Sequence, residues 1–230
     1  VNAVSGSVVY EYSLAGDLLS ETNELGHKKT YTYDAYGNKL SQTDAKGNTA
    51  YYTYDANNNL LTDTDVLGNV TTYTYDSLNR LVSVKDANNY TVTYGYDALG
   101  RRTTVTDARN NVFTTVYDGN GNVVMTVDAK GKTVRQTVYN SLNLASSVTD
   151  AAGKTTSYTY NALGKVNTVT DPFNNSHSYT YNSRGNNTAV TDALNGQSSA
   201  QYDAMGNITR LAGPLGGATN YTYDEMGRCI

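Results

Sequence analysis

The chain has 230 residues, of which 22 are tyrosine and only 38% are hydrophobic, and 17 Lys and Arg against 21 Asp and Glu give a net charge of −4. This acidic balance leaves no basic surface for nucleic acid or anionic lipid, and no apolar run approaches the roughly 18 residues that a membrane helix needs. One cysteine excludes an internal disulfide framework. The low content of aliphatic residues excludes a thick aliphatic core, and tyrosine must therefore supply much of the buried surface.

Tyrosine recurs along the chain at a fixed spacing. We call the following eleven residues the anchor tyrosines: Tyr12, Tyr33, Tyr54, Tyr75, Tyr96, Tyr117, Tyr139, Tyr160, Tyr181, Tyr202 and Tyr223. Each step is 21 residues, except for 22 from Tyr117 to Tyr139. A fixed period indicates a repeat architecture, so we predict a single array over residues 1–230, with about eleven repeats of which the first and last are incomplete. The extra residue lies between residues 128 and 139 and predicts one bulge or loop insertion.

Two turn signals mark each repeat. Gly or Asn always stands four residues after the anchor tyrosine, and again about half a period later, which makes 21 positions. These residue types enter the left-handed backbone region at low cost, so we predict positive φ at all of them. Asp or Asn stands three residues before many of them, as at Asp34 and Asn140, and is expected to accept backbone N–H groups. Together with the anchor tyrosines, seven glycines define the repeat: Gly37, Gly100, Gly121, Gly164, Gly185, Gly206 and Gly227.

The residues between the turns are strand formers. Tyr31-Thr32-Tyr33 recurs unchanged in five later repeats, and Leu81-Val82-Ser83-Val84 is typical of the other arm. Residues two apart lie on the same face of a strand, so both tyrosines of each pair share a face. No helical period is sustained. We therefore predict an all-β fold in which tandem 21-residue β-hairpins form a continuous antiparallel strip of about 22 strands.

Stability has to come from contacts between neighbouring hairpins, because a single hairpin is marginal in water. Nineteen tyrosines stand at the anchor position or two residues before it. We expect them to form two aromatic ladders, in which each cross-strand pair contributes roughly 0.2–1 kcal/mol. The other arm supplies a thinner apolar line, Leu18, Leu60, Leu81, Val123, Val166 and Ile208. Lys39, Arg102 and Asn187 interrupt it, which indicates a face that looks onto a wet cavity or solvent.

The pattern Tyr-x-Tyr-Asp-x-x-Gly, followed by an apolar arm and Asp-x-x-Gly, resembles the RHS/YD repeat. Clear instances are Tyr94-Gly95-Tyr96-Asp97-Ala98-Leu99-Gly100-Arg101 and Tyr221-Thr222-Tyr223-Asp224-Glu225-Met226-Gly227-Arg228. The resemblance covers essentially the whole chain. It implies a hairpin strip that curves or spirals into a hollow shell, as in bacterial Rhs polymorphic toxins, the cocoon subunit of Tc insecticidal toxins and teneurin adhesion receptors. In the bacterial members the shell encloses a C-terminal toxin.

Two features depart from the family pattern. The arginine after the first turn residue is present at Arg80, Arg101 and Arg228, and Asn replaces it at Asn38, Asn59, Asn122, Asn186 and Asn207. In addition, nothing resembles the core segment that plugs the bacterial shell, no toxin domain follows, and the last repeat is incomplete. We therefore expect a piece of a longer bacterial protein, secreted or on the cell surface, whose targeting signal lies outside this chain; residues 1–6 have no signal-peptide pattern.

The resemblance implies a non-enzymatic structural segment of a shell that encapsulates a toxin or displays a surface. Its partners would be the rest of the shell, the core and the toxin of its own parent chain. The alternative is a carbohydrate- or receptor-binding module of an adhesin, because tyrosine rings flanked by Asn and Asp can stack on sugars; Tyr158 and Tyr179 are the candidate stacking residues. The two open edges of such a strip also predict edge-to-edge self-association.

No catalytic, metal or cofactor site is predicted. Fifteen of the 21 acidic residues fall at periodic turn positions, which indicates turn closure instead of acid–base chemistry. Asp63 and Asp65 are the nearest carboxylate pair but lack a third calcium ligand. His27 and His177 have no recognisable metal partner. Cys229 stands where other repeats carry an apolar residue and is expected to be a small core hydrophobe.

Overall fold

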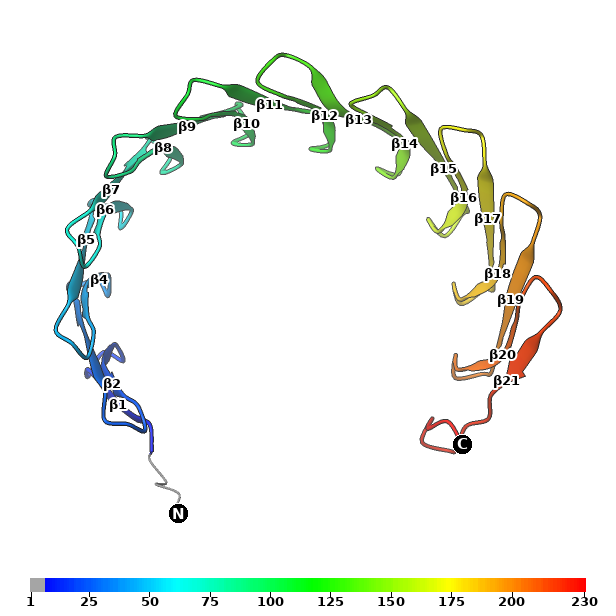
Figure 1. The fold of residues 1–230 in the computed structure, drawn as a ribbon, viewed down its shortest axis with the longest axis horizontal. Coiled ribbons are helices and arrows are strands. Elements are labelled where there is room, and N and C mark those ends of the chain that lie inside the picture. Colours follow the sequence, from blue (N-terminus) through cyan, green and yellow to red (C-terminus); the bar gives the residue numbers. More distant parts are fainter. Residues whose placement is uncertain (1–6) are drawn as a thin grey trace. The chain divides into compact units, whose positions relative to one another are not determined.

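The computed structural model describes residues 7–230, so residues 1–6, discussed above for the lack of a signal pattern, lie outside the described residues. Within 7–230 the chain forms 21 strands and no helix. It divides into two compact units, residues 1–113 and 114–230. Figure 1 shows the hairpins of each unit following one another in sequence order. The predicted all-β hairpin fold is confirmed.

The strands of the first unit are β1 (Val9–Tyr12), β2 (Leu18–Thr22), β3 (Lys28–Tyr33), β4 (Lys39–Thr43), β5 (Thr49–Tyr54), β6 (Leu60–Thr64), β7 (Val70–Tyr75), β8 (Leu81–Lys85), β9 (Thr91–Tyr96) and β10 (Arg102–Thr106). Strand β11 (Val112–Tyr117) begins at the end of this unit. The remaining strands are β12 (Val123–Val127), β13 (Thr133–Tyr139), β14 (Ala145–Asp150), β15 (Thr155–Tyr160), β16 (Val166–Thr170), β17 (Ser176–Tyr181), β18 (Asn187–Thr191), β19 (Gln197–Tyr202), β20 (Ile208–Ala212) and β21 (Ala218–Asn220).

Consecutive strands pair antiparallel, from β1 to β10 in the first unit and from β11 to β21 in the second. The last repeat adds only an isolated bridge between Tyr223 and Cys229. The described residues therefore hold one strand fewer than the 22 expected.

Every described turn is closed by the same two backbone hydrogen bonds, and the turn at Asp34 is representative of those in which Asp or Asn adds side-chain bonds. The Asp34 N–H donates to the Asn38 carbonyl (2.9 Å) and the Gly37 N–H donates to the Asp34 carbonyl (3.2 Å). The Asp34 carboxylate accepts the N–H groups of Tyr36 (2.8 Å) and Asn38 (2.9 Å). These bonds satisfy amides that the tight turn removes from the strand ladder. The predicted role of Asp and Asn in the turns is confirmed.

The residue that completes each turn adopts the left-handed conformation. φ lies between 71° and 95° at fourteen glycines and between 59° and 66° at seven asparagines, and these are the 21 positions of the two turn signals. The prediction of positive φ is therefore confirmed at every one. Gly100, for example, has φ of +79°, with Nη1 of Arg80 3.8 Å from the place that a Cβ would take.

A β-bulge follows the first turn of each hairpin. In the pair β3–β4, Thr32 is opposite Ser41 and Tyr33 is opposite Lys39, which leaves Leu40 as the extra residue. The same register shift occurs at the anchor tyrosine of the other paired hairpins. Bulges bend and twist the strand that carries them, so these repeated shifts give each unit its steady bend.

The 22-residue step corresponds to one further bulge. Thr126 is opposite Arg135 and Val127 is opposite Thr133, so Val134 is unpaired in the ladder between β12 and β13. Strand β13 accordingly has seven residues where the equivalent strands mostly have six. The structure thus places the extra residue inside a strand and leaves both adjoining turns unchanged.

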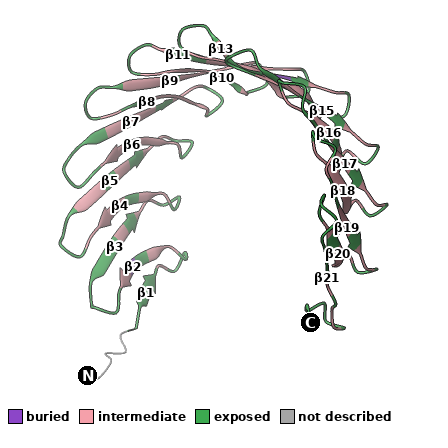
Figure 2. Cartoon of the chain, turned by 45° about the vertical axis from the view of Figure 1, so that its right-hand side comes forward, coloured by how far each residue is buried: buried purple, intermediate pink, exposed green. Residues whose placement is uncertain are grey.

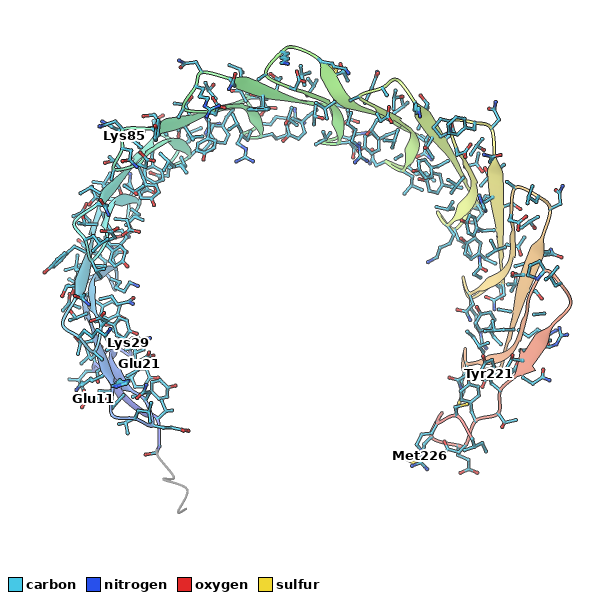
Figure 3. The ribbon with its side chains drawn as sticks, viewed as in Figure 1. Glu11, Glu21, Lys29, Lys85, Tyr221 and Met226 are labelled. Carbon is cyan, nitrogen blue, oxygen red and sulfur yellow. The ribbon has the colours of Figure 1, made fainter. Side chains whose placement is uncertain are left out.

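The strands present two chemically different faces. We call the side that carries the anchor tyrosines the tyrosine face, and the opposite side the hydroxyl face. On the hydroxyl face, hydroxyls pair across strands, as in Thr53 with Thr62 and Thr74 with Ser83, both at 2.6 Å. Lys85 also belongs to the hydroxyl face, since it is opposite Thr72, and Figure 3 shows it on the outer side of the bend in the first unit.

No hydrophobic residue in the described part of the chain is fully buried. The two buried residues are polar, Ser20 at 2% and Thr137 at 4% exposed. Figure 2 shows half-buried strands joined by exposed turns. Each unit is one sheet layer without an aliphatic core, which confirms the expectation from composition.

Replacing Gly100 with Val should lower the free energy of unfolding by about 1–3 kcal/mol, because a β-branched residue is strained at positive φ. Gly119→Ala is the matched control, since Gly119 lacks a positive φ and has open space around its missing Cβ. The control should be neutral or stabilising by up to about 1 kcal/mol. Urea unfolding measures both, and equal midpoints for Gly100→Val and the wild type would contradict the turn assignment.

The lowered pKa values of the turn carboxylates predict that the protein loses stability in acid. Hydrogen bonds from the Asn38, Asn59 and Asn69 side chains, helped by backbone N–H groups, lower the pKa of Asp34, Asp55 and Asp65. A lowered folded-state pKa means that the stabilisation is complete above the unfolded value, about 3.9, and is lost as pH falls through the folded value. The melting temperature should therefore be flat from neutral pH to about pH 5 and fall below about pH 4.

A triple variant, Asp34→Asn, Asp55→Asn and Asp65→Asn, separates these carboxylates from other acid effects. Asn closes the same turn at Asn140, where its side-chain oxygen accepts the N–H groups of Leu142 and Leu144. The variant should fold, and its melting temperature should fall less between pH 6 and pH 3 than that of the wild type. Identical acid losses in both proteins would rule out this contribution.

Candidate functional site

The anchor tyrosines connect each hairpin to the one before it. Tyr54 ends β5, and its hydroxyl donates to the carbonyl of Lys39, the first residue of β4, at 3.0 Å. The ladder between β4 and β5 ends at the pair Ser41 and Tyr51, so this hydrogen bond joins the two hairpins beyond the end of the ladder. The same bond is made by Tyr33, Tyr96, Tyr139, Tyr160, Tyr181, Tyr202 and Tyr223, among the anchor tyrosines that the structure describes.

Aliphatic side chains separate the anchor rings. Tyr54 is opposite Leu60 and Tyr75 is opposite Leu81, so the apolar line of the second arm lies on the tyrosine face. Tyrosines of successive hairpins stand on strands that are two strand spacings apart, roughly 9.6 Å. This separation exceeds the 4.5–7 Å between the ring centroids of aromatic side chains in contact. The expected ladders of cross-strand aromatic pairs are therefore wrong. A ring pair does occur between Tyr10 and Tyr12, but on one strand, with centroids 6.5 Å apart.

Two of the charged residues that interrupt the apolar line are packed on tyrosine rings. The ammonium of Lys39 is 4.8 Å from the ring centroid of Tyr52 and 6.0 Å from that of Tyr31. The guanidinium of Arg102 is 5.5 Å from the ring centroid of Tyr94. A cation over a ring contributes about 0.5–1 kcal/mol at exposed sites while its stem covers apolar surface. These charges therefore continue the packing of the tyrosine face.

The neighbouring hairpins half-bury the anchor rings. Ten of the eleven anchors are half-buried, whereas Tyr12, in the first described hairpin, is 60% exposed. Burial raises the pKa of Tyr54, Tyr75 and Tyr160 above the ordinary value for tyrosine. The phenols therefore stay protonated well above neutral pH, which keeps their hydroxyls as donors.

Asparagine replaces the family arginine in the contact between successive turns. The side-chain amide of Asn38 donates to Asp34 in its own turn (2.9 Å) and to the Asn58 side chain in the next hairpin (2.7 Å). Arg80 spans the same gap, because it pairs with Asp76 at 2.7 Å and donates to the Asp97 carbonyl at 3.3 Å. At Asn38, therefore, a shorter side chain makes an equivalent link to the next turn.

The candidate sugar-stacking residues lie on the tyrosine face. Tyr158 is opposite Val169 and Tyr179 is opposite Val190, and both tyrosines are half-buried. Part of each side chain is therefore open to a ligand. The assignment of a sugar to these rings stays a prediction.

The remaining singled-out residues are not brought together. His27 and His177 are exposed, and no group of three His, Cys, Asp or Glu able to hold a metal ion occurs within residues 7–230. The same residues include no helix long and apolar enough to cross a membrane. Cys229 is exposed, so the expectation of a core hydrophobe is wrong there; the final repeat forms only a bridge and does not cover it.

Tyr54→Phe should lower the free energy of unfolding by about 0.5–1.5 kcal/mol, the usual net value of one hydrogen bond, because the ring remains and only the bond to the Lys39 carbonyl is lost. Tyr51→Phe is the control on the same strand, on the hydroxyl face, where Tyr51 is 57% exposed. Chemical denaturation compares the two. A loss no larger for Tyr54→Phe than for Tyr51→Phe would mean that the bond contributes nothing.

Comparison with known proteins agrees with this geometry. The RHS Repeat model matches residues 5–49, 54–88, 75–112, 139–176 and 181–218, whereas no curated protein matches. The crystal structure of TcdB2-TccC3-TEV is similar with a TM-score of 0.64 and 16% identity, over 100% of this chain and 15% of that one. That of TcdB2-TccC3 is similar with a TM-score of 0.51 and 13% identity, over 97% and 15%. This chain thus spans about 15% of either structure, whose fold it shares, and it belongs to the RHS repeat family.

Proposed function

We propose that this chain is a structural, non-enzymatic wall segment of an RHS shell in a longer protein. The observation that carries the proposal is the repeated bond from an anchor tyrosine to the preceding hairpin. Each hairpin is stabilised by its neighbour and has no core of its own, so further hairpins can extend the wall without changing its chemistry. Such an extendable strip suits the enclosure of space better than the construction of a catalytic pocket.

The two faces fit a wall that separates an interior from solvent. The hydroxyl face, with pairs such as Thr159 and Thr168 at 2.7 Å, suits contact with water. The tyrosine face is the half-apolar side and lies opposite the outer side marked by Lys85 in the first unit. We infer that it lines the enclosed volume, and that the parent is a secreted bacterial protein whose C-terminal toxin is the cargo.

Protection of that cargo tests enclosure. In the full-length parent, the C-terminal domain should resist trypsin under conditions in which the same domain, produced alone, is cut. Gly100→Val together with Gly164→Val opens the wall at two turns and should expose the domain, whereas Gly119→Ala should leave it protected. A C-terminal domain that is cut equally fast in the intact parent and alone would refute enclosure.

Carbohydrate binding is the second candidate, because Tyr158 and Tyr179 present half-buried rings two strands apart on one face. A glycan array probed with this chain and with its Tyr158→Ala, Tyr179→Ala variant examines it directly. Binding by the wild type that the variant loses would favour a sugar-binding module. Absence of binding across a broad array would leave the wall as the function.

A further inference from the structure

Three positions in the second unit lack the tyrosine that elsewhere stands two residues before the anchor, and Ala200 is one of them. Eight hairpins have this tyrosine, while Thr115, Thr137 and Ala200 occupy the other three positions. A hollow of about 400 Å³ lies beside Ala200. Its lining includes Val190, Leu211, Asn187, Ser198 and Thr219.

The strand register shows what Ala200 leaves uncovered. Ala200 is opposite Leu211. In four other hairpins the equivalent aliphatic residue is opposite a tyrosine: Val84 with Tyr73, Val105 with Tyr94, Val169 with Tyr158, and Val190 with Tyr179. Those four valines are half-buried, whereas Leu211 is 39% exposed. The hollow is therefore the place of one missing ring, and Leu211 is its uncovered floor.

The other interruptions differ from this one. Thr137 is only 4% exposed, so neighbouring residues cover it. Thr115 is half-buried and is opposite another polar residue, Thr126, so no aliphatic side chain is left uncovered there. Among these three positions, only Ala200 combines a small side chain with an exposed aliphatic partner.

We propose that this hollow, the Ala200 site, binds one aromatic side chain presented by another polypeptide segment. The ring would lie on Leu211 beside Val190, as a tyrosine two residues before the anchor lies on its aliphatic partner elsewhere in the sheet. Asn187, Ser198 and Thr219 border the hollow and offer partners to a phenol hydroxyl or an indole N–H. Natural large-to-small replacements that leave an apolar space favour an apolar guest of the missing shape.

An aromatic side chain fits better than a sugar. Val190, Ala200 and Leu211 supply the apolar surface of the hollow, and a pyranose would bury hydroxyls against them at a cost unless each found a partner. The Ala200 site gives the sheet a defined point at which a separate segment of polypeptide can be held, whether or not the sheet encloses a cargo.

Titration of this chain with N-acetyl-L-tyrosinamide, followed through methyl NMR signals, tests the site. Saturable shifts are expected at the methyl groups of Ala200, Val190 and Leu211, and N-acetyl-L-alaninamide should produce none. Ala200→Tyr fills the hollow and should weaken the apparent affinity at least tenfold. Ala193→Tyr is the matched control, because it adds the same side chain in an exposed turn and should leave binding unchanged.

A second variant covers the case in which Ala200→Tyr fails to fold. Leu211→Asn removes the apolar floor at a partly exposed position and should also abolish the shifts. Unchanged affinity in a folded Ala200→Tyr or Leu211→Asn variant would overturn the proposal. Shifts spread over the whole tyrosine face would also overturn it. So would saturable shifts at these methyl groups that appear with methyl glucoside but not with the tyrosinamide.

Discussion

The structure depends on the contact between each anchor tyrosine and the preceding hairpin. A sheet of one layer has no interior, so a side chain is shielded from water only by the strands beside it. Tyr54 shows how the sequence meets this constraint: it is opposite Leu60, while its hydroxyl donates to the Lys39 carbonyl beyond the end of the ladder. Tyrosine suits the position because one side chain provides both apolar surface and a hydrogen-bond donor.

The turns make this contact repeatable. Positive φ at positions such as Gly37 and Asn58 reverses the chain within five residues, and the carboxylates of Asp34 and Asp55 accept the amides that the reversal frees. The bulge that follows, as at Leu40, bends each hairpin in the same sense. Because every repeat carries both devices, small local bends accumulate while the two faces keep distinct chemistry.

Variation between repeats is tolerated where a different side chain makes an equivalent contact. Asn38 and Arg80 each connect one turn to the next, with a short amide pair in the first case and a long guanidinium in the second. Lys39 stands in the aliphatic line, yet packs on the ring of Tyr52. Ala200 is different, because nothing in the described structure replaces its ring and Leu211 stays exposed. A sheet built of near-identical hairpins thus has one place that differs from the others.

The amino-acid sequence by itself determined the repeat, the hairpins and the turn conformations. Each of these is a local property: the type of residue at a turn sets the accessible φ, and alternation along a strand sets the face. The tyrosine period located every anchor, and the extra residue before Tyr139 was placed to within a few positions.

Only the tertiary structure decided what the side chains touch. Two aromatic ladders looked equally consistent with the period, but the second arm of each hairpin lies between the rings, so Tyr54 meets Leu60 and the Lys39 backbone in place of another tyrosine. The bulge at Leu40, the asparagine link from Asn38 and the uncovered Leu211 likewise depend on register between strands. Register brings together residues of different strands, such as Tyr54 with Leu60 and with the Lys39 carbonyl, and a pattern of residue types along one strand does not say which residues those are.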